Sequence, residues 1–418
     1  MTRPDDIRIA DLASPVLTRA QAAAVAYAER QPVELSAPGI LAEATKRAGL
    51  SDFGRDDFRA RLAVQCRSID EDVGLNALGR LGVHANLVRY ATNRLRFEDL
   101  LRRNPEILDV QIERPLIVAG MPRTGTTHLL NLIGADTRLR SLPYWESLEP
   151  VPARGEGPGR DGRDPRWTRC QQSYQLMVAN MPLIVAMHDM PPEHIHEEIE
   201  LEELDFASYL LEWLCRPARW RDHYLALDQR PHYAYMKRVL QALTWLRGPR
   251  RWVLKSPQHL EQLPALLETF PDATIVITHR DPVSVVRSAI TMLGYGDRMR
   301  RKSVDLAGLA DYWIDRVERL LAACVRDRER IPAAQAIDVP FHEFMADDLG
   351  MVARIYEKAG LPMTAAARGA LEAFLAANPR GKHGQVVYDL KGDFGLEPAE
   401  VRRRFGAYLE RFPVRIED

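Results

Sequence analysis

Short apolar runs, separated by longer segments with helical spacing, dominate the hydrophobic pattern after about residue 112. Four of these runs lie at residues 115–119, 251–254, 273–278 and 336–341. Their length and their apolar, β-prone residues are typical of buried strands. A helical segment, residues 260–270, joins the second run to the third. A strand, a helix and a strand at this spacing predict a right-handed parallel crossover, and therefore an α/β fold with helices on both faces of a parallel sheet.

The first 112 residues show helical spacing instead. One apolar set is Leu62, Cys66, Ile69 and Val73, and a second, approximate set is Leu87, Tyr90, Leu95 and Phe97. A polar break at residues 52–57 contains a glycine. No cluster of chemically reactive side chains occurs here. We therefore expect an N-terminal helical region, residues 1–112, that forms a layer or a dimerisation arm ahead of the main domain at residues 113–418.

A helical insertion is predicted within the main domain, at about residues 150–250. It opens with a loop rich in Gly, Pro, Arg and Asp at residues 152–165, and reads as helical from Trp167 to about Trp220. Four methionines lie among its apolar residues, at positions 177, 181, 187 and 190. A methionine-rich face is typical of a core, but it also suits an adaptable apolar pocket, and we place a small or lipophilic ligand there.

Composition narrows the classes of partner. The chain has 418 residues and a net charge of −1, which argues against a global basic surface for nucleic acid or anionic membrane. We find no apolar run of membrane-spanning length and no apolar leader near the start. Four scattered cysteines suit a reducing compartment better than a disulfide framework. We expect a cytoplasmic protein whose oligomeric state is open.

The stretch from Pro115 to Leu132 carries the clearest chemical signal. An apolar run leads into the loop at residues 120–127 and then into a helix, the arrangement in which backbone N–H groups and a helix N-terminus bind phosphate. Gly120 and Gly125 have the spacing of GxxxxGK[ST], but Thr126 stands where that motif has Lys. Because that Lys serves the β- and γ-phosphates, this loop should bind a ligand without a triphosphate. The positive charge lies within the loop instead, at Arg123.

The sequence MPRTGTTHL resembles the phosphosulfate loop of sulfotransferases that use 3′-phosphoadenosine 5′-phosphosulfate (PAPS), in the Arg form of many bacterial members. The resemblance implies a three-layer, P-loop NTPase-like fold and transfer of a sulfonate group from PAPS to a hydroxyl group. It assigns the phosphosulfate end of the donor to the loop residues Pro122, Arg123, Thr124, Gly125, Thr126 and Thr127. An ATP-dependent kinase and a non-catalytic nucleotide-binding protein are the alternatives.

Two later motifs support the resemblance. A strand ends at His279-Arg280, Asp281 and Pro282 can start a helix, and Ser288 follows Arg280 by eight positions. An Arg and a Ser at this spacing form the family's 3′-phosphate site, where a guanidinium and a hydroxyl meet a dianion. The segment containing Arg380, Gly381 and Lys382 resembles the basic C-terminal loop that closes over the same phosphate.

Several side chains are candidates for catalysis. Lys255 stands at a strand end, where the family has a sulfate-contacting Lys-x-His, but Pro257 takes the His position and His259 lies two residues late. The base that deprotonates the acceptor hydroxyl could be His196, with His194 the second choice among nearby histidines. Glu146 is the candidate by analogy with the Arg-loop branch, and His259 is a third possibility.

A metal site is not expected, although His194 and His196 are followed by Glu197 and Glu198. No further ligands follow at a recognised spacing. The transferred group carries one charge, which Arg123 and Lys255 can balance. The resemblance therefore implies PAPS as the co-substrate, without a metal ion.

Overall fold

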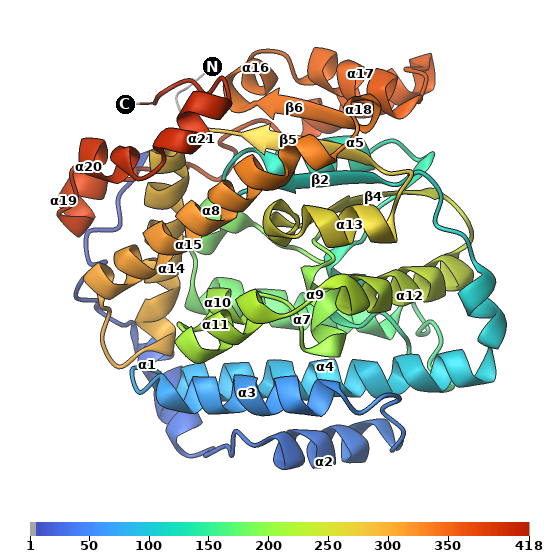
Figure 1. The fold of residues 1–418 in the computed structure, drawn as a ribbon. Helices are drawn as coiled ribbons and strands as arrows, with labels where there is room; N and C mark the ends of the chain where they lie inside the picture. Colours follow the sequence, from blue (N-terminus) through green and yellow to red (C-terminus); the bar gives the residue numbers. More distant parts are fainter. Residues whose placement is uncertain (1–5, 418) are drawn as a thin grey trace.

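A parallel five-stranded sheet forms the centre of the computed structural model, which describes residues 6–417 (Figure 1). The strand order is β3-β4-β2-β5-β6, and every neighbouring pair is parallel. Their bounds are β2 Leu116–Gly120, β3 Leu139–Arg140, β4 Arg251–Lys255, β5 Thr274–His279 and β6 Ala336–Pro340. Each predicted run lies within about one residue of a strand. The predicted α/β fold with a parallel sheet is confirmed.

Alternate residues of the central strand face two different cores, as the period of a strand requires. Leu116 and Val118 of β2 pack with one set of helices, whereas Ile117 and Ala119 belong to the larger core on the opposite face. The smaller core is covered by α5 Thr126–Gly134, α16 Phe341–Ala346, α17 Asp348–Ala359 and α18 Ala365–Ala377. The larger core is covered on the sheet side by α13 Leu263–Thr269, α14 Pro282–Arg300 and α15 Leu306–Asp327.

Local sequence explains where these helices begin. Asp281 caps α14, because its Oδ1 accepts the N–H of Val283 at 3.0 Å and Pro282 follows it. The helix expected at residues 260–270 is split into a 3₁₀ turn, Pro257–Glu261, and α13. Pro264 lies in the first turn of α13, where its missing N–H costs nothing.

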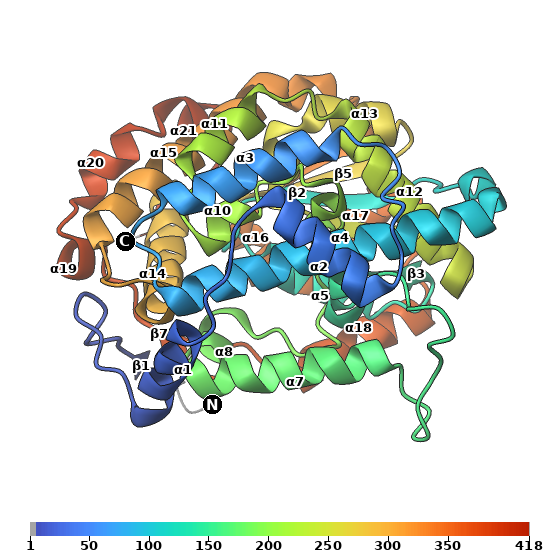
Figure 2. The same cartoon turned by 90° about the horizontal axis from the view of Figure 1, so that it is seen from below.

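The N-terminal region folds as the predicted layer of helices, on the side of the insertion away from the sheet (Figure 2). Its helices are α1 Arg19–Glu29, α2 Ala37–Ala48, α3 Phe58–Glu71 and α4 Ala77–Arg103. All four residues of the second apolar set are buried in α4. The prediction that Val73 continues the first apolar set is wrong, because α3 ends at Glu71 and Val73 is 77 % exposed. The division at residue 112 stays a prediction, although the largest hydrophobic core includes residues from both sides of it.

The insertion is helical only in pieces, which corrects the expectation of continuous helix from Trp167 to Trp220. The short helix α6 Tyr144–Leu148 precedes it. Its own helices are α7 Pro165–Asn180, α8 Ile184–His188, α9 Ile199–Glu202, α10 Leu211–Leu214, α11 Ala218–Ala226 and α12 Arg230–Arg247. Residues 189–198 form no helix. The pair Pro191-Pro192 explains this break, because proline lacks an N–H and disfavours helix at the residue before it. In Figure 1, α9 to α12 lie between the sheet and the N-terminal layer.

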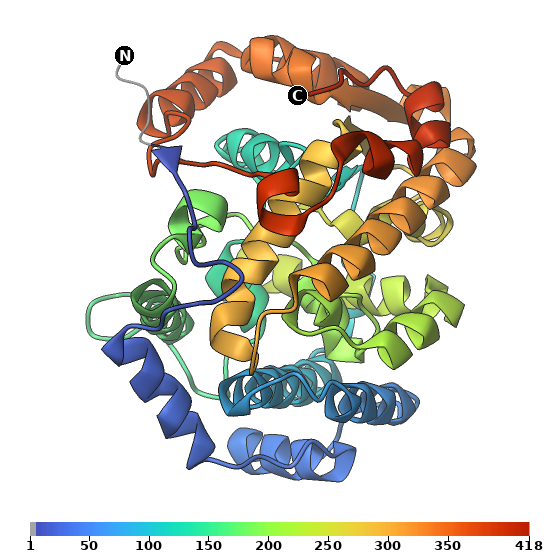
Figure 3. The same cartoon turned by 90° about the vertical axis from the view of Figure 1, so that its left-hand side faces the viewer.

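The start of the described chain pairs with a much later segment in a small parallel sheet, β1 Asp6–Ile7 with β7 Gln385–Val386 (Figure 3). Met177, Met181 and Met187 pack in a third hydrophobic cluster together with residues from both of these segments. The methionine-rich face is therefore largely core. The chain then continues through α19 Leu390–Phe394, α20 Pro398–Arg403 and α21 Gly406–Arg411.

Within residues 6–417, none of the helices combines the length and apolar character that a membrane span requires. A cytoplasmic location stays a prediction.

Candidate functional site

The loop between β2 and α5 has the backbone of a phosphate cradle. Gly125 precedes α5 with φ of 83°, a left-handed conformation that glycine adopts without strain. Gly120 allows a close approach, because a Cβ there would lie 1.9 Å from the Thr278 hydroxyl oxygen. The Thr124 hydroxyl lies 2.6 Å from both that hydroxyl and the Met121 carbonyl oxygen. These contacts hold the loop so that the first N–H groups of α5 are available to an anion.

Arg123 connects this loop to three other parts of the chain. Its Nε donates to the Ser288 hydroxyl at 2.8 Å, and its Nη1 donates to the Met187 carbonyl at 2.5 Å. Its Nη2 donates to the Tyr388 hydroxyl at 3.2 Å. Arg123 and Ser288, which the sequence assigned to opposite ends of the donor, are thus in direct contact, although 165 positions separate them.

Arg280 lies directly after β5, and its guanidinium contacts the Arg123 carbonyl, the Phe341 ring and the Glu417 carboxylate. Its Nη1 donates to the Arg123 carbonyl at 2.6 Å, and its guanidinium carbon lies 4.0 Å from the centre of the Phe341 ring. Its Nε and Nη2 each donate to one carboxylate oxygen of Glu417 at 2.6 Å. The guanidinium therefore presents a two-donor edge to an anion, and here that anion is Glu417.

The predicted basic loop near the C-terminus lies beside α5. Arg380 forms an ion pair with Asp348 at 2.6 Å, and Asp348 also contacts His128 of α5 at 2.9 Å. Gly381 has φ of 73°, and Lys382 donates to the Asn378 side chain at 3.1 Å. Asp348 thus attaches the Arg380 loop to the helix that follows the cradle.

One cavity of about 610 Å³ brings most of these elements together. Its walls include Arg123, residues 125–127, Arg280 and residues 380–382. His188 and His194 also line it, beside the apolar side chains Met187, Phe341, Met345 and Phe374. Four basic side chains from three separate sequence motifs therefore face one space together with three histidines, His128, His188 and His194.

Three histidines form a cluster at one side of this cavity, and His196 is the most buried of them. The ring centres of His188 and His194 lie 5.5 Å apart, and those of His194 and His196 lie 6.0 Å apart. Burial, with a smaller contribution from Lys255, lowers the pKa of His194 to about 3. Burial and the neighbouring histidines likewise hold the pKa values of His188 and His196 well below 6.5. All three rings are therefore neutral at pH 7, the form that accepts a proton.

His196 itself lies behind the cavity wall and is 8 % exposed. Its ring lies 4.6 Å from that of Tyr144, and its Nδ1 has no hydrogen-bond partner among the described residues. The Nδ1 of His188 likewise has no hydrogen-bond partner among residues 6–417.

Lys255 ends β4 and is almost completely buried. Its ammonium group forms an ion pair with Glu197, and its backbone N–H donates to Glu198 at 2.8 Å. Burial raises the pKa of Glu197 from its usual value, and the charge of Lys255 opposes that effect. The lysine thus lies next to the histidine segment, held by a carboxylate.

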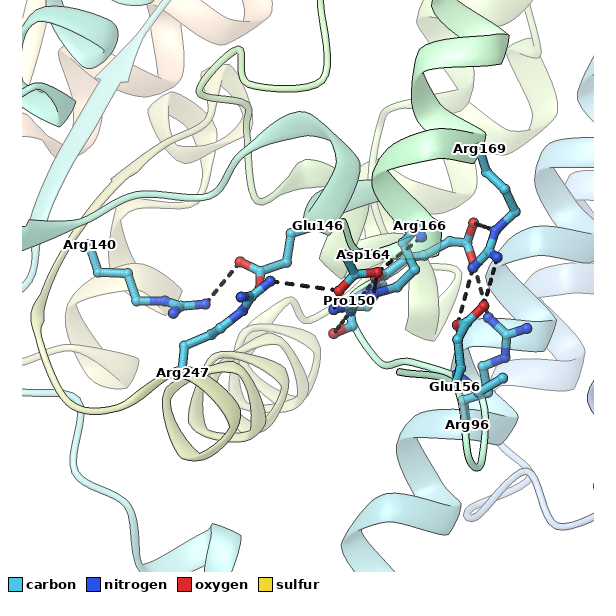
Figure 4. Close-up of polar contacts among 11 residues, drawn as sticks. Arg96, Arg140, Glu146, Pro150, Glu156, Asp164, Arg166, Arg169 and Arg247 are labelled. Carbon is cyan, nitrogen blue, oxygen red and sulfur yellow. Dashed lines mark hydrogen bonds and ion pairs between the residues drawn. The ribbon is translucent and has the colours of Figure 1, made fainter. Parts of the chain in front are cut away.

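His259 and Glu146 lie elsewhere. His259 is fully buried, with Nε2 2.6 Å from Glu198 and Nδ1 2.8 Å from the Tyr233 hydroxyl. Glu146 lies in α6 between Arg140 at 2.9 Å and Arg247 at 3.0 Å (Figure 4). Neither side chain is among the described residues that line the 610 Å³ cavity.

Sequence reasoning assigned no role to His188, Asp348, Tyr388 and Glu417. His188 had a local signal, since it opens the histidine-rich segment. The other three act through contacts between distant parts of the chain, which no local pattern reveals. Among residues 6–417, no group of three or more His, Cys, Asp or Glu side chains is arranged to hold a metal ion.

Comparisons with known proteins match this chain to sulfotransferases. The profile of the sulfotransferase family matches residues 115–365. The crystal structure of sulfotransferase STF1 from Mycobacterium tuberculosis H37Rv is 31% identical, with a TM-score of 0.77, covering 88% of this chain and 97% of that one. Sulfotransferase STF9 from Mycobacterium avium is 28% identical, with a TM-score of 0.80, covering 91% and 98%. A search of curated proteins found no match.

Proposed function

This chain belongs to the sulfotransferase family, and we propose that it transfers the sulfonate group of PAPS to a hydroxyl group of a small or lipophilic alcohol. The observation that carries this proposal is the 610 Å³ cavity. It combines a phosphate cradle, four basic side chains, neutral histidines and an apolar wall, which are the groups that a nucleotide sulfonate donor and an alcohol require together.

We assign the phosphosulfate end of the donor to the cradle. Pro122 and Thr124 shape the loop, while the N–H groups of Gly125, Thr126 and Thr127 and the side chain of Arg123 bind the anion. Catalysis then rests on positioning and on stabilising charge that develops on the oxygen between sulfur and phosphorus.

The 3′-phosphate is assigned to Arg280 and Ser288. Arg280 offers two parallel donors. Ser288 accepts a hydrogen bond from Arg123 and keeps its own O–H proton to donate. Arg380, Gly381 and Lys382 line the same cavity and would close over the donor.

Lys255 is proposed as a second cation near the sulfonate, from its place beside the histidine segment. The sulfonate carries a single charge, which Arg123 and Lys255 can balance. We therefore propose that transfer needs no metal ion.

Among the predicted bases, we propose His196. Its Nδ1 is unpaired within the described chain, whereas both ring nitrogens of His259 and both oxygens of Glu146 have partners. A base needs a free lone pair to accept the hydroxyl proton. Because His196 lies behind the wall, a small movement of His194 or Tyr144 must open its path. His194, which lines the cavity, is the second choice.

The acceptor class is inferred from the apolar part of the wall, namely Met187, Phe341, Met345 and Phe374. Such side chains bind apolar surface and reject highly charged glycans.

The test is incubation with sulfur-labelled PAPS and a panel of alcohols, with mass spectrometry for the added sulfonate. We expect transfer to apolar alcohols in the presence of EDTA. Arg123→Ala serves as the inactive control. Binding of ATP with Mg²⁺ but not of adenosine 3′,5′-bisphosphate in a thermal-shift assay would refute the proposal and favour a kinase.

A further inference from the structure

The two-donor edge of Arg280 is occupied by a side chain of the same protein. Both carboxylate oxygens of Glu417 accept hydrogen bonds from it, at 2.6 Å each. This parallel pair is the geometry that a guanidinium also offers to phosphate. Since the same two N–H groups cannot serve two anions at once, Glu417 and a phosphate exclude each other at Arg280.

The backbone of Glu417 is held separately from its side chain. Its N–H donates to Asp281 Oδ2 at 2.9 Å, and Arg402 donates to the same oxygen at 3.0 Å. Asp281 is fully buried and also caps α14. The side chain of Glu417 can therefore leave Arg280 by rotation while its backbone stays in place.

A second cavity, of about 580 Å³, lies beside this contact. Residues 415–417 form one wall, and Arg280, Phe341 and Met345 line both this cavity and the first. Glu417 thus lines the second cavity and contacts Arg280, which lines both, so there is room beside it for a displaced carboxylate.

The remaining bond of Arg280 does not depend on Glu417. Its Nη1 donates to the Arg123 carbonyl of the cradle. Replacing a carboxylate by a phosphate at the other two donors would leave this bond intact, so the cradle need not rearrange when the anions exchange.

We propose that Glu417 is a residue of the donor site that competes with the 3′-phosphate for Arg280. The inference rests on the proposed function, which places that phosphate at Arg280. Donor and bisphosphate product carry the same 3′-phosphate, so the competition weakens the binding of both. Its consequence is faster release of the product, because a carboxylate replaces the departing phosphate at once.

The test compares binding of adenosine 3′,5′-bisphosphate and of adenosine 5′-phosphosulfate, which lacks the 3′-phosphate, by calorimetry. In Glu417→Gln, we expect the bisphosphate to bind about tenfold more tightly and to dissociate more slowly in stopped flow, since no ion pair must be broken. Binding of adenosine 5′-phosphosulfate should not change. Glu410→Gln, an exposed carboxylate on α21, removes the same charge as a matched control.

A double-mutant cycle completes the test. In an Arg280→Ala background, Glu417→Gln should leave bisphosphate affinity unchanged, because the contested donors are gone. Unchanged or weaker bisphosphate binding in the single variant would overturn the inference, because Glu417 would then be inert or would support Arg280. A wild-type protein that binds no bisphosphate at all would instead refute the proposed function.

Discussion

Arg123 is the residue on which the cradle depends most. Its φ of 72° places a non-glycine residue in the left-handed region, which costs about 1 to 3 kcal/mol. Three hydrogen bonds from its guanidinium, to Ser288, Met187 and Tyr388, hold this conformation. The side chain thereby points toward α14 and α8.

Replacement of His196 tests the proposed base. His196→Ala should lower kcat by about 10²-fold or more, the usual scale for loss of a general base, with bisphosphate affinity unchanged. His84→Ala, on α4 in the N-terminal layer, is the control. Near-normal turnover in His196→Ala together with an inactive His194→Ala would transfer the role to His194.

The pH dependence of the same reaction follows from the direction of the pKa shift. An ordinary histidine base would be protonated below about pH 6. Burial lowers the pKa of His196, so its neutral, active form persists further into acid. Turnover should therefore stay nearly constant between pH 7 and pH 6, and a half-maximal rate near pH 6.5 would contradict this assignment.

At the scale of single residues, the site residues that belong to short motifs could be predicted from the sequence. The contact between Arg123 and Ser288 and that between Arg280 and the cradle join residues that local patterns had already marked. Glu417 and Tyr388 carry no motif, and only the folded chain brings them to the site. Glu146 forms ion pairs with Arg140 and Arg247, and its candidacy as the base rests on the analogy with the Arg-loop branch alone.

At the scale of elements, buried charges join the N-terminal layer to the insertion. Asp205 follows α9 and accepts from Arg61 of α3 at 2.8 Å and from Arg94 of α4 at 2.9 Å. Its other oxygen lies 2.6 Å from the His232 ring. All four side chains are buried. One carboxylate thus pairs with two arginines, from α3 and α4, and contacts a ring on α12.

Asp205→Ala should destabilise the protein by about 3 to 5 kcal/mol, because the buried Arg94 loses its counter-ion and the buried Arg61 keeps only the exposed Asp57. Urea unfolding followed by circular dichroism measures this change. Glu43→Ala, which removes a partly exposed partner of Arg47 on α2, should change the free energy of unfolding by less than about 0.5 kcal/mol. Equal effects of the two variants would show that Asp205 does not join these elements.

The strands were predictable because parallel strands buried on both faces are continuous apolar runs. The insertion was less predictable, since its apolar residues suit several short helices as well as one long one. The pair Pro191-Pro192 was the available signal for the break that places His194 and His196 in an extended segment.

At the scale of the whole molecule, the buried neutral histidines make stability depend on pH. The pKa of His194 falls from 6.5 in the unfolded chain to about 3 in the folded protein. Below pH 6.5 the unfolded chain binds a proton at this site and the folded protein does not. Acid therefore favours unfolding, over a window from about pH 6.5 to about pH 3.

The free energy of unfolding of His194→Gln relative to the wild type isolates this group, since all other titrating groups are common to both proteins. The difference should shift in favour of the variant by about 1.4 kcal/mol for each pH unit below about 6.5, and should be flat above pH 7.5. Urea titrations at pH 8.0, 7.5, 6.0 and 5.0 measure it. A difference that is independent of pH would mean that His194 is not buried as a neutral ring.

The pairing of β1 with β7 has a consequence for biosynthesis. Ribosomes make the cradle early, but Tyr388, just after β7, is among the partners that hold Arg123. Until that segment emerges and pairs with β1, a nascent chain has the phosphate loop without one of its supports. Activity should therefore appear late in translation, and interrupted synthesis should leave no half-active fragment.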